Sequence, residues 1–397
     1  MSRAVKTLLF STLYPSAARP MHGIFVETRL RELLKTGRVE TRVVAPVPWF
    51  PSSDPRWGDY ARMARTPAQE TRHGIAVVHP RYFLPPRIGM TAAPLLLALG
   101  ARPALQRLLA SGFDFDVIDA HYYYPDGVAA TLLGAWFGKP VTVTARGTDI
   151  NLISNFFWPR KMLQWAGRRA SASIGVSAAL VERMRALAFD ARRLHVMRNG
   201  VDLERFQPLA PAAMRAELEL GGGPVLLTVG NLQAHKGQRL VIEALALLRR
   251  QHPQASLLVI GEGPDAGPLA QLAASLGLAQ AVRFVGMVPN QDLARWYSAA
   301  DVLVLASSRE GWPNVLLEAM ACGTPVVASQ VGGVSEIVQA SSVGRVVTDR
   351  SPAAFALAID QLLAARIDRQ WVRRYAEDFG WGRTSQDQVR LFESLRG

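Results

Sequence analysis

The sequence predicts an α/β protein made of two doubly wound domains, each with a parallel sheet. Three observations predict this class. The chain has 397 residues, which at about 150 residues per domain indicates two or three domains. Short apolar runs, many of them β-branched, alternate with helix-length segments, as in βαβ units whose strands are covered on both faces. The alternation stops near residue 200 in turn-forming residues and then begins again.

The first set of elements predicts an N-terminal domain over residues 1–200. Its strands are short and apolar, and helix-length segments separate several of them. The expected strands are 5–10, 41–45, 75–79, 117–120, 141–144, 173–176 and 194–197, and the expected helices are 25–35, 127–137 and 178–187.

The second set predicts a C-terminal domain over residues 201–397, and we expect the last helix, about 384–396, to pack back on the N-terminal domain. Ligands of such sheets bind at the carboxyl ends of the strands, so we expect a cleft between the two domains. The expected strands are 225–229, 256–260, 282–285, 302–305, 325–328 and 345–347, and the expected helices are 237–250, 269–276, 291–299 and 315–321.

The composition limits the classes of molecule that the protein could bind. The chain carries 45 Lys and Arg against 32 Asp and Glu, a formal net charge of +13, which indicates an anionic partner. The basic residues are scattered and form no known nucleic-acid module, so we expect no nucleic-acid partner. The longest apolar stretch, 92–101, is far shorter than the ~20 residues of a membrane span, and the N-terminus has no signal-peptide core. With a single cysteine, Cys322, these features predict a cytoplasmic protein.

The sharpest motif is the segment 310–328, which follows the predicted strand 302–305. Glu310 and Gly311 stand in the loop after that strand, and Pro313 favours a helix start at the next residues. On this helix the first amides, those of Asn314 and Val315, would have no intrahelical acceptor, which makes an anion site.

Glu318 lies on the first or second turn of the same helix. Its carboxylate can therefore reach the same ligand and accept two hydrogen bonds from a vicinal diol, such as that of a ribose. The alternative is a capped helix whose glutamates are only solvated.

The pattern Glu-Gly-x-Pro-Asn with a second glutamate, Glu318, eight positions after Glu310 resembles the signature of the retaining glycosyltransferases of family 4. The resemblance implies the GT-B fold, in which two Rossmann-like domains face each other across a cleft. It also implies a hexosyltransferase-type enzyme with a nucleotide-diphosphate sugar as donor. Other segments occur in the family's order, namely 199–202, 230–237, 261–264, 286–289 and 296–301.

The resemblance implies roles in the donor site. Glu310 would contact hydroxyls of the transferred sugar, and Glu318 would hold the ribose. The amides of Gly311, Asn314 and Val315 would face the sugar and the diphosphate.

Lys236 would neutralise the diphosphate as it leaves, by preorganised electrostatics, and it joins Glu310 among the expected catalytic residues. Many family members have Arg where this chain has Asn231, which is expected to contact the donor and can donate a hydrogen bond but brings no charge. We therefore expect the diphosphate to be neutralised either by Lys236 alone or by Lys236 together with a cation from elsewhere in the chain.

The N-terminal domain is expected to receive the acceptor. Gly23 opens a helix after the first strand and allows close backbone approach; the resemblance places it near the donor phosphates. His121 ends a strand, where it would face the cleft, and the resemblance makes it the third catalytic residue; the alternative is a packed histidine. Asp126, Arg146 and Asp149 are expected to bind the acceptor, although Asp149 could instead cap its own loop.

No cofactor and no metal are expected. The segment 261–266 fits a dinucleotide fingerprint but lacks the acidic residue that a nicotinamide site needs about 20 positions later. The Asp114-Phe115-Asp116 triplet has the spacing of a metal-binding motif. It lies in the N-terminal domain, however, whereas the donor diphosphate is expected in the C-terminal one.

Two basic stretches with leucines or aromatic residues, 87–110 and 155–169, suit an anionic interface. They predict a peripheral enzyme on the inner face of the cell membrane and a cell-surface glycan or lipid-linked acceptor. The bland alternative is that they are ordinary helices packed on the sheet. Two other functions remain open: a nucleotide-sugar epimerase on the same fold and, less favoured, a basic nucleic-acid-binding protein.

Overall fold

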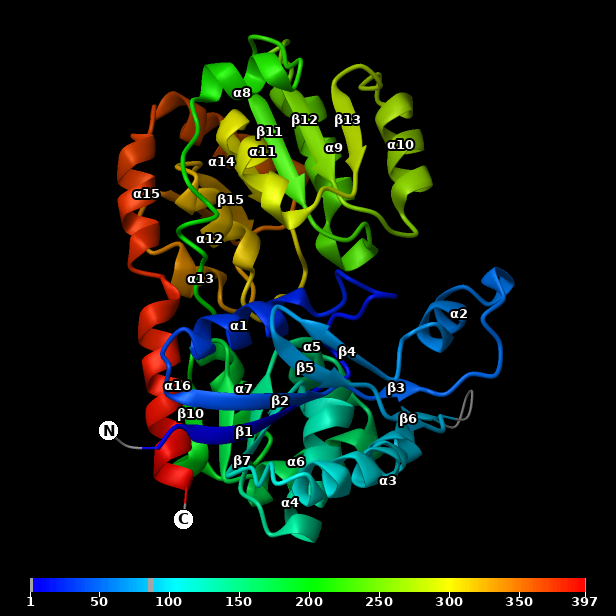
Figure 1. Cartoon of the computed structure of the whole chain (residues 1–397). Helices are drawn as coiled ribbons and strands as arrows, with labels where there is room; N and C mark the ends of the chain where they lie inside the picture. The colour runs from blue at the N-terminus through cyan, green and yellow to red at the C-terminus, as the bar shows by residue number, and fades with distance from the viewer. Residues whose placement is uncertain (1–2, 85–88, 397) are drawn as a thin grey trace. The chain divides into compact units, whose positions relative to one another are not determined.

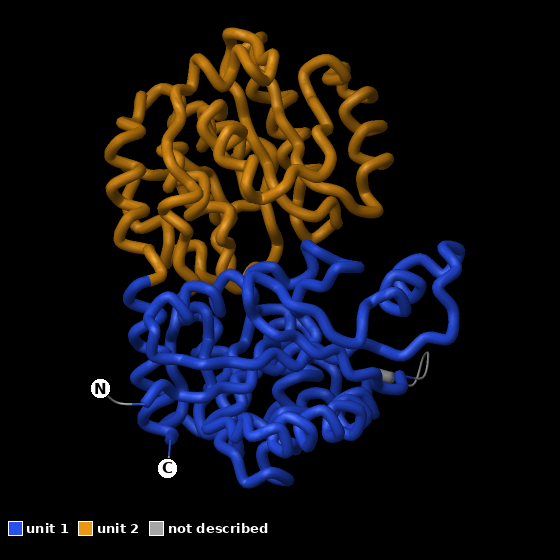
Figure 2. Tube along the Cα trace, viewed as in Figure 1, with its two compact units in different colours: residues 1–198, 382–397 blue, residues 199–381 orange. Residues whose placement is uncertain are grey.

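The computed structural model describes residues 3–84 and 89–396. The chain divides into two compact units (Figure 2). Unit 1 comprises Met1–Arg198 and Gly382–Gly397, and unit 2 comprises Asn199–Trp381. The chain therefore leaves unit 1 close to residue 200 and returns to it at its end. Each unit is an α/β structure around a largely or wholly parallel sheet, which confirms the predicted fold class.

Unit 1 holds a sheet whose described strands run in the order β10-β9-β8-β7-β1-β2-β5-β4 (Figure 1). All neighbours are parallel except β4 and β5, which are antiparallel. The strands are β1 Val5–Phe10, β2 Val39–Val44, β4 Gln69–Arg72, β5 Ile75–Val78, β7 Val117–His121, β8 Val141–Ala145, β9 Ala172–Gly175 and β10 Leu194–Val196, with β3 Val47–Pro48 and β6 Arg81–Tyr82 in a small separate sheet.

Helices cover this sheet, and the last helix of the chain completes its core. Val389 and Phe392 of α16 are fully buried against Val5, Leu33 and Val117, so the end of the chain packs on the strands at its beginning. The helices are α1 Ile24–Leu34, α2 Asp59–Ala64, α3 Gly89–Ala110, α4 Val128–Phe137, α5 Thr148–Asn151, α6 Phe157–Arg169, α7 Ala178–Ala186 and α16 Trp381–Leu395.

Unit 2 holds a fully parallel sheet in the order β13-β12-β11-β14-β15-β16 (Figure 1). Its buried aliphatic strands explain why the sequence pattern was clear here. The strands are β11 Val225–Val229, β12 Ser256–Ile260, β13 Val282–Gly286, β14 Val302–Leu305, β15 Val326–Ser329 and β16 Gly344–Val347. The helices are α8 Pro211–Glu217, α9 Gln238–Leu248, α10 Ala266–Ser275, α11 Leu293–Ala299, α12 Asn314–Ala321, α13 Val334–Ile337, α14 Pro352–Ala364 and α15 Arg369–Glu377.

The edge strand β4 is an element that the sequence pattern did not predict. Its residues are all polar and none is fully buried, so no apolar run marks it. It is held by antiparallel pairing with β5. An edge strand needs only one partner and one covered face, which is why hydrophobicity alone did not reveal it.

Candidate active site

Two loops of unit 2 join the side chains that the sequence assigned to sugar and diphosphate. Lys236 follows β11, and Glu310 follows β14. The Lys236 ammonium donates to Glu310 Oε1 at 2.8 Å, and the Ser307 hydroxyl donates to the same oxygen at 2.7 Å. The backbone amide of Ser308 also donates to the His235 carbonyl at 2.7 Å. These bonds hold the two loops together.

The loop that carries Glu310 rests directly on a glycine after β15. Gly332 has a φ of +51°, and a Cβ at this position would lie 2.1 Å from the Glu310 carbonyl oxygen. The neighbouring Gly333 amide donates to the Gly311 carbonyl at 3.1 Å. Only glycine fits this approach, and the contact holds Glu310 in place from behind.

The N-terminus of α12 presents amides with no capping side chain. Pro313 is its N-cap and supplies no side-chain hydrogen bond, so the amides of Asn314 and Val315 keep their donors for a ligand. The Asn314 side-chain oxygen accepts from Asn199 Nδ2 at 3.4 Å. The helix thus starts where the sequence predicts, and the anion site at its first amides stays a prediction.

Glu318 lies on the second turn of α12, partly buried, and accepts a hydrogen bond from the Tyr297 hydroxyl at 2.8 Å. Burial raises the pKa of Glu318 to about 7, while the Tyr297 hydrogen bond and the Arg205 charge act in the opposite direction. Hydroxyl donors on a ligand favour the charged carboxylate. Binding of a diol at Glu318 is therefore coupled to loss of its proton near neutral pH.

Arg309 is a cation that the sequence analysis missed. Its guanidinium has no hydrogen bond or ion pair to any residue that the structure describes, and its Nε is buried. Burial lowers the pKa of His235, and the charges of Arg309 and Lys236 lower it further, so the three groups are close. Asn231 itself is exposed. The signal that could have found Arg309 is its place directly before Glu310.

In unit 1, Gly23 is the N-cap of α1 and adopts a left-handed conformation with φ +69°. A Cβ here would lie 2.3 Å from the Leu13 carbonyl oxygen. The loop after β1 therefore requires glycine for its own packing. Its predicted position near the donor phosphates stays a prediction.

His121 ends β7, as predicted, but its ring is engaged on both sides. Nδ1 lies 2.5 Å from an Arg146 nitrogen, and Nε2 lies 3.2 Å from Asp119 Oδ2. Because a guanidinium only donates, Nδ1 accepts and the ring proton is on Nε2. Burial lowers the pKa of His121 to about 4, and the Arg146 charge adds to this while Asp119 opposes it. The ring is therefore neutral at pH 7.

This geometry corrects the expectation that the His121 side chain faces a substrate. The ring is 1% exposed, and neither nitrogen is left for a ligand. Its Nδ1 contacts Arg146, which is partly exposed and lies over the Phe25 ring at 5.1 Å. Burial lowers the pKa of Arg146 to about 9, and Arg146 remains the candidate for an anionic part of the acceptor.

The last helix supports this network from behind. Gln388 of α16 donates from Nε2 to Asp119 Oδ2 at 3.1 Å, and its Oε1 accepts from Arg29 Nε at 2.9 Å. Arg29 and Gln388 are both buried. Nothing near His121 in the sequence points to these residues.

Asp126 and Asp149 are completely buried, which corrects their assignment as acceptor contacts. Asp126 accepts from the Thr12 amide at 2.7 Å and from the Thr12 hydroxyl at 2.9 Å. Asp149 accepts from the amides of Tyr123 and Gly147, each at 2.7 Å. Both carboxylates hold the loops at the strand ends, which is the capping alternative for Asp149.

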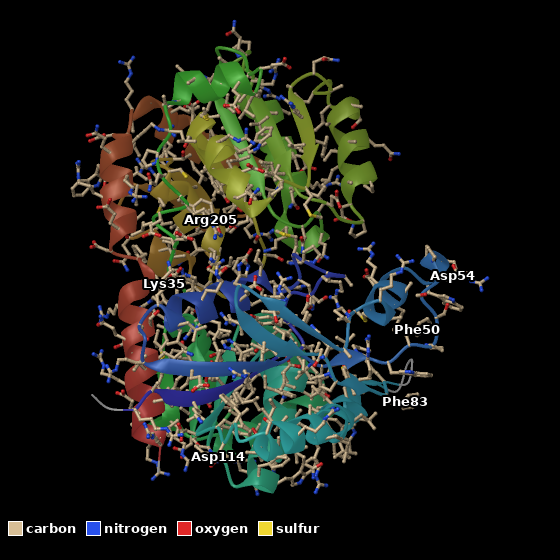
Figure 3. The ribbon with its side chains drawn as sticks, viewed as in Figure 1. Lys35, Phe50, Asp54, Phe83, Asp114 and Arg205 are labelled. Carbon is tan, nitrogen blue, oxygen red and sulfur yellow. The ribbon has the colours of Figure 1, made fainter. Side chains whose placement is uncertain are left out.

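The candidate metal-binding triplet has other partners. Asp114 forms an ion pair with Lys139 at 2.6 Å, and Asp116 accepts from the Lys6 amide at 2.8 Å (Figure 3 labels Asp114). Within residues 3–84 and 89–396, no three His, Cys, Asp or Glu side chains gather as a metal site would need.

We expect the enzyme to keep its activity in excess EDTA, because Lys236, Arg309 and the α12 amides supply the positive charge that a metal would otherwise supply to a diphosphate. The measurement is release of nucleoside diphosphate with and without the chelator. Loss of activity that manganese restores would contradict this prediction.

Comparison with known proteins adds independent information. Residues 31–205 match the model described as Glycosyltransferase Family 4, and residues 211–379 match the model described as Glycosyl transferases group 1. A D-inositol 3-phosphate glycosyltransferase of Frankia alni is 34% identical over 307 residues, which cover 70% of this chain and 74% of that protein. A putative teichuronic acid biosynthesis glycosyltransferase, TuaC of Bacillus subtilis, is 31% identical over 340 residues, which cover 84% of this chain and 83% of that protein.

Solved structures of similar fold cover nearly the whole chain. Sucrose-phosphate synthase from Thermosynechococcus elongatus superposes with a TM-score of 0.80 at 23% identity and 99% coverage of both chains. Anabaena HepE in complex with UDP has a TM-score of 0.74 at 20% identity and covers 98% of this chain and 100% of its own. These likenesses confirm the predicted fold.

Proposed function

The chain belongs to the group 1 glycosyl transferases of family 4, and from this premise we propose that it transfers a sugar, with retention of configuration, from a nucleotide-diphosphate sugar to a hydroxyl acceptor. The acceptor that we propose is a cell-surface glycan or its lipid-linked precursor. Membership of the family makes the protein a glycosyltransferase. The retention of configuration, the identity of the acceptor and the role at the cell surface are what we propose.

One observation carries the donor part of this proposal: Lys236 and Glu310 are bonded at 2.8 Å beside the uncapped first turn of α12. Cation, carboxylate and free amides are what a sugar diphosphate requires, since it presents hydroxyls and negative phosphates together. Similar folds that bind nucleotides support it, because HepE is described in complex with UDP and with UDP-glucose.

The hydrogen bond between Lys236 and Glu310 indicates that Lys236 exchanges this partner for the diphosphate when the donor binds. The Lys236 ammonium now neutralises Glu310, but a diphosphate offers it a stronger partner. When Lys236 turns to the phosphate, Glu310 gains an oxygen for sugar hydroxyls. The bond from the anomeric carbon to the phosphate oxygen then breaks and leaves its electron pair on the diphosphate, the acceptor oxygen bonds to that carbon, and the proton of the acceptor hydroxyl passes to the departing phosphate oxygen. Lys236 and Arg309 stabilise the diphosphate charge that develops.

The acceptor part rests on weaker support, namely the resemblance of the 310–328 block and the description of one relative. TuaC is described as a putative teichuronic acid biosynthesis glycosyltransferase, and its name points to an acidic product. A partly exposed Arg146 in unit 1 agrees with an acceptor that carries negative charge.

A donor screen tests the proposed function. Nucleoside diphosphate release is measured for a panel of nucleotide sugars, with and without candidate glycan acceptors, and the anomeric configuration of the product is read by NMR. A sugar product with the donor's configuration supports the proposal. An epimerised free sugar from donor alone would identify an epimerase instead, and an inverted product would refute retention.

Unit 1 also carries exposed aromatic residues beside basic ones, and we propose that this face associates with anionic membrane. On α6, Phe157 is 64% and Trp158 59% exposed, next to the exposed Arg160 and Lys161. The neighbouring α3 exposes Leu95 and Leu99, and it also carries the exposed Arg102 and Arg107 of the stretch 87–110. Arg87 itself lies outside the described residues. In the part of the chain that the structure covers, no helix has the length and hydropathy to cross a bilayer.

In liposome flotation, we expect the protein to float with anionic vesicles and not with neutral ones. Each basic residue near an anionic surface contributes about 1 kcal/mol, so added salt should weaken binding. Trp158→Ala should reduce flotation. The control is Trp371→Ala on α15 of unit 2, a tryptophan that is 46% exposed. No flotation at low salt, or equal loss in both variants, would contradict membrane association through α6.

A further inference from the structure

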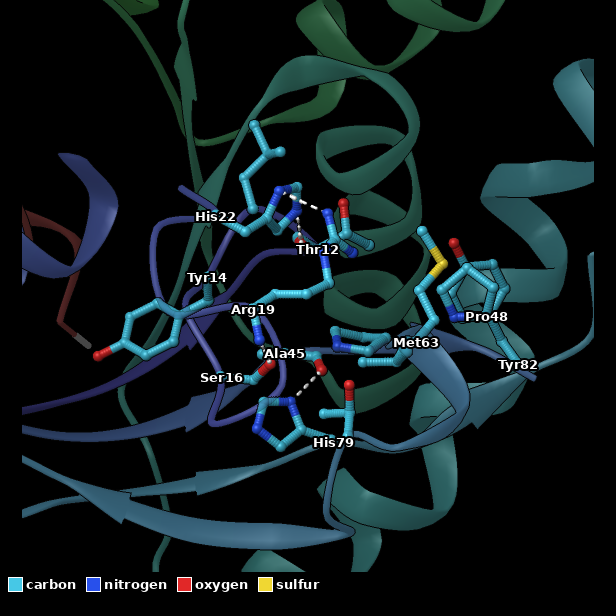
Figure 4. A pocket seen from close by; sticks show the side chains of 14 residues that line it. Thr12, Tyr14, Ser16, Arg19, His22, Ala45, Pro48, Met63, His79 and Tyr82 are labelled. Carbon is cyan, nitrogen blue, oxygen red and sulfur yellow. Dashed lines mark hydrogen bonds between the residues drawn. The ribbon is translucent and has the colours of Figure 1, made fainter. Parts of the chain in front are cut away.

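Unit 1 contains a pocket of about 210 Å³ that the assigned residues do not explain (Figure 4). It lies where the loop after β1 meets the residues that follow β2 and β5. Figure 4 shows Arg19 and His22 on one side of it and His79 on the other. The chemistry of these walls indicates what the pocket holds.

Arg19 brings a positive charge that no carboxylate of the described residues approaches within ion-pair distance. Its one side-chain partner among them is His22, whose Nδ1 lies 2.6 Å from Arg19 Nη2. His22 Nε2 in turn donates to the Thr12 carbonyl at 3.1 Å. Burial lowers the pKa of His22 to about 4, and the Arg19 charge contributes. The histidine is therefore neutral and does not offset the guanidinium charge, on which the Asp59 carboxylate acts from beyond ion-pair distance.

The loop that carries Arg19 is held in place by the wall opposite. The Ala17 amide donates to Glu70 Oε2 at 3.1 Å, and Glu70 Oε1 lies 2.8 Å from His79 Nε2. His79 Nδ1 donates to the Ala45 carbonyl at 2.9 Å. Glu70 is thus occupied, and the loop is preorganised with its arginine at the pocket.

A second observation points to a ligand. Thr66 lines the same pocket and is 4% exposed, yet its hydroxyl has no hydrogen-bond partner among the described residues. A buried hydroxyl without a partner costs free energy unless something bonds to it. An oxygen-rich anion would satisfy both this hydroxyl and the guanidinium.

Resting on the proposed function, we propose that the Arg19 pocket binds an anionic group, a phosphate or a carboxylate, carried by the acceptor. The acceptor class is then an acidic saccharide rather than a neutral one. A guanidinium in a partly desolvated site binds such groups through two parallel hydrogen bonds, which gives orientation as well as affinity. The pocket would thereby select acceptors by charge.

Calorimetric titration of the full chain tests this with two pairs of probes. They are glucose 6-phosphate against glucose, and methyl glucuronide against methyl glucoside. We expect at least one anionic probe to bind ~10-fold or more tightly than its neutral partner, as a charged hydrogen-bond pair predicts. The pair that shows the preference identifies phosphate or carboxylate. Arg19→Gln should abolish the preference, whereas Arg56→Gln, at an exposed arginine of the same unit that pairs with Asp54 and lies over the Trp57 ring, should preserve it.

UDP is titrated into the same proteins, so that two failures can be told apart. If UDP binds the native chain but neither anionic probe binds better than its neutral partner, the inference is wrong and the proposed function stands. If Arg19→Gln also weakens UDP, Arg19 belongs to the donor phosphates and the inference is again wrong. If Arg19→Gln lowers the melting temperature strongly, His22→Ala replaces it, because this change removes only the residue that orients Arg19. A preference unchanged in His22→Ala would then count against the pocket.

Discussion

Lys236→Ala should lower kcat by about 10²-fold or more, the loss typical when one preorganised charge is removed from a developing anion. The reason is that Lys236 acts more strongly on the departing diphosphate than on the bound donor, so the loss falls on the transition state. Steady-state kinetics with the donor identified by the screen measure the effect.

The control for this change is Lys35→Ala, because Lys35 is an exposed lysine on the surface of unit 1 that pairs with Glu32 at 2.8 Å. It should leave kcat unchanged. Arg309→Gln should give a smaller decrease than Lys236→Ala, since Lys236 is hydrogen-bonded to Glu310, whereas the Arg309 guanidinium has no hydrogen bond or ion pair to any described residue. A rise in KM with kcat unaltered in Lys236→Ala would make Lys236 a binding residue and refute its role in the chemical step.

Glu318→Ala should weaken nucleotide binding by about 10- to 150-fold, because it removes a charged acceptor of ribose hydroxyls that is worth ~1.5–3 kcal/mol. The pH dependence of the native protein gives a second signature. Burial raises the pKa of Glu318 to about 7, and the ligand favours the ionised form. Affinity should therefore fall as the pH drops below 7, with release of a proton on binding near pH 7.

Calorimetry in buffers of different ionisation enthalpy measures both quantities. Glu318→Gln keeps the shape of the side chain but cannot titrate, so its affinity should show no such pH dependence. The matched control is Glu217→Ala, an exposed glutamate of unit 2 paired with Arg295 at 2.6 Å. Unchanged UDP affinity in Glu318→Ala would remove the ribose assignment.

The arrangement of the residues expected to bind the donor could be predicted from the sequence because these residues are close together in the chain. Glu310, the α12 amides and Glu318 lie within nine consecutive residues, so the geometry of one loop and one helix brings them together. Buried parallel strands likewise leave an unbroken apolar pattern. These elements therefore depend on chain neighbours and on hydrophobic periodicity, which a sequence displays directly.

Burial and hydrogen-bond partners were decided only by the tertiary structure. Gln388 reaches Asp119 across 269 positions of the chain, and Asp119 and Arg146 occupy the two ring nitrogens of the buried His121. Asp126 and Asp149 lie in the helical turns that follow β7 and β8, yet backbone amides, among them those of Thr12 and Tyr123, occupy their oxygens. A polar residue's role depends on what packs around it, because water and protein partners compete for the same donors and acceptors. That competition is resolved only when the chain is folded.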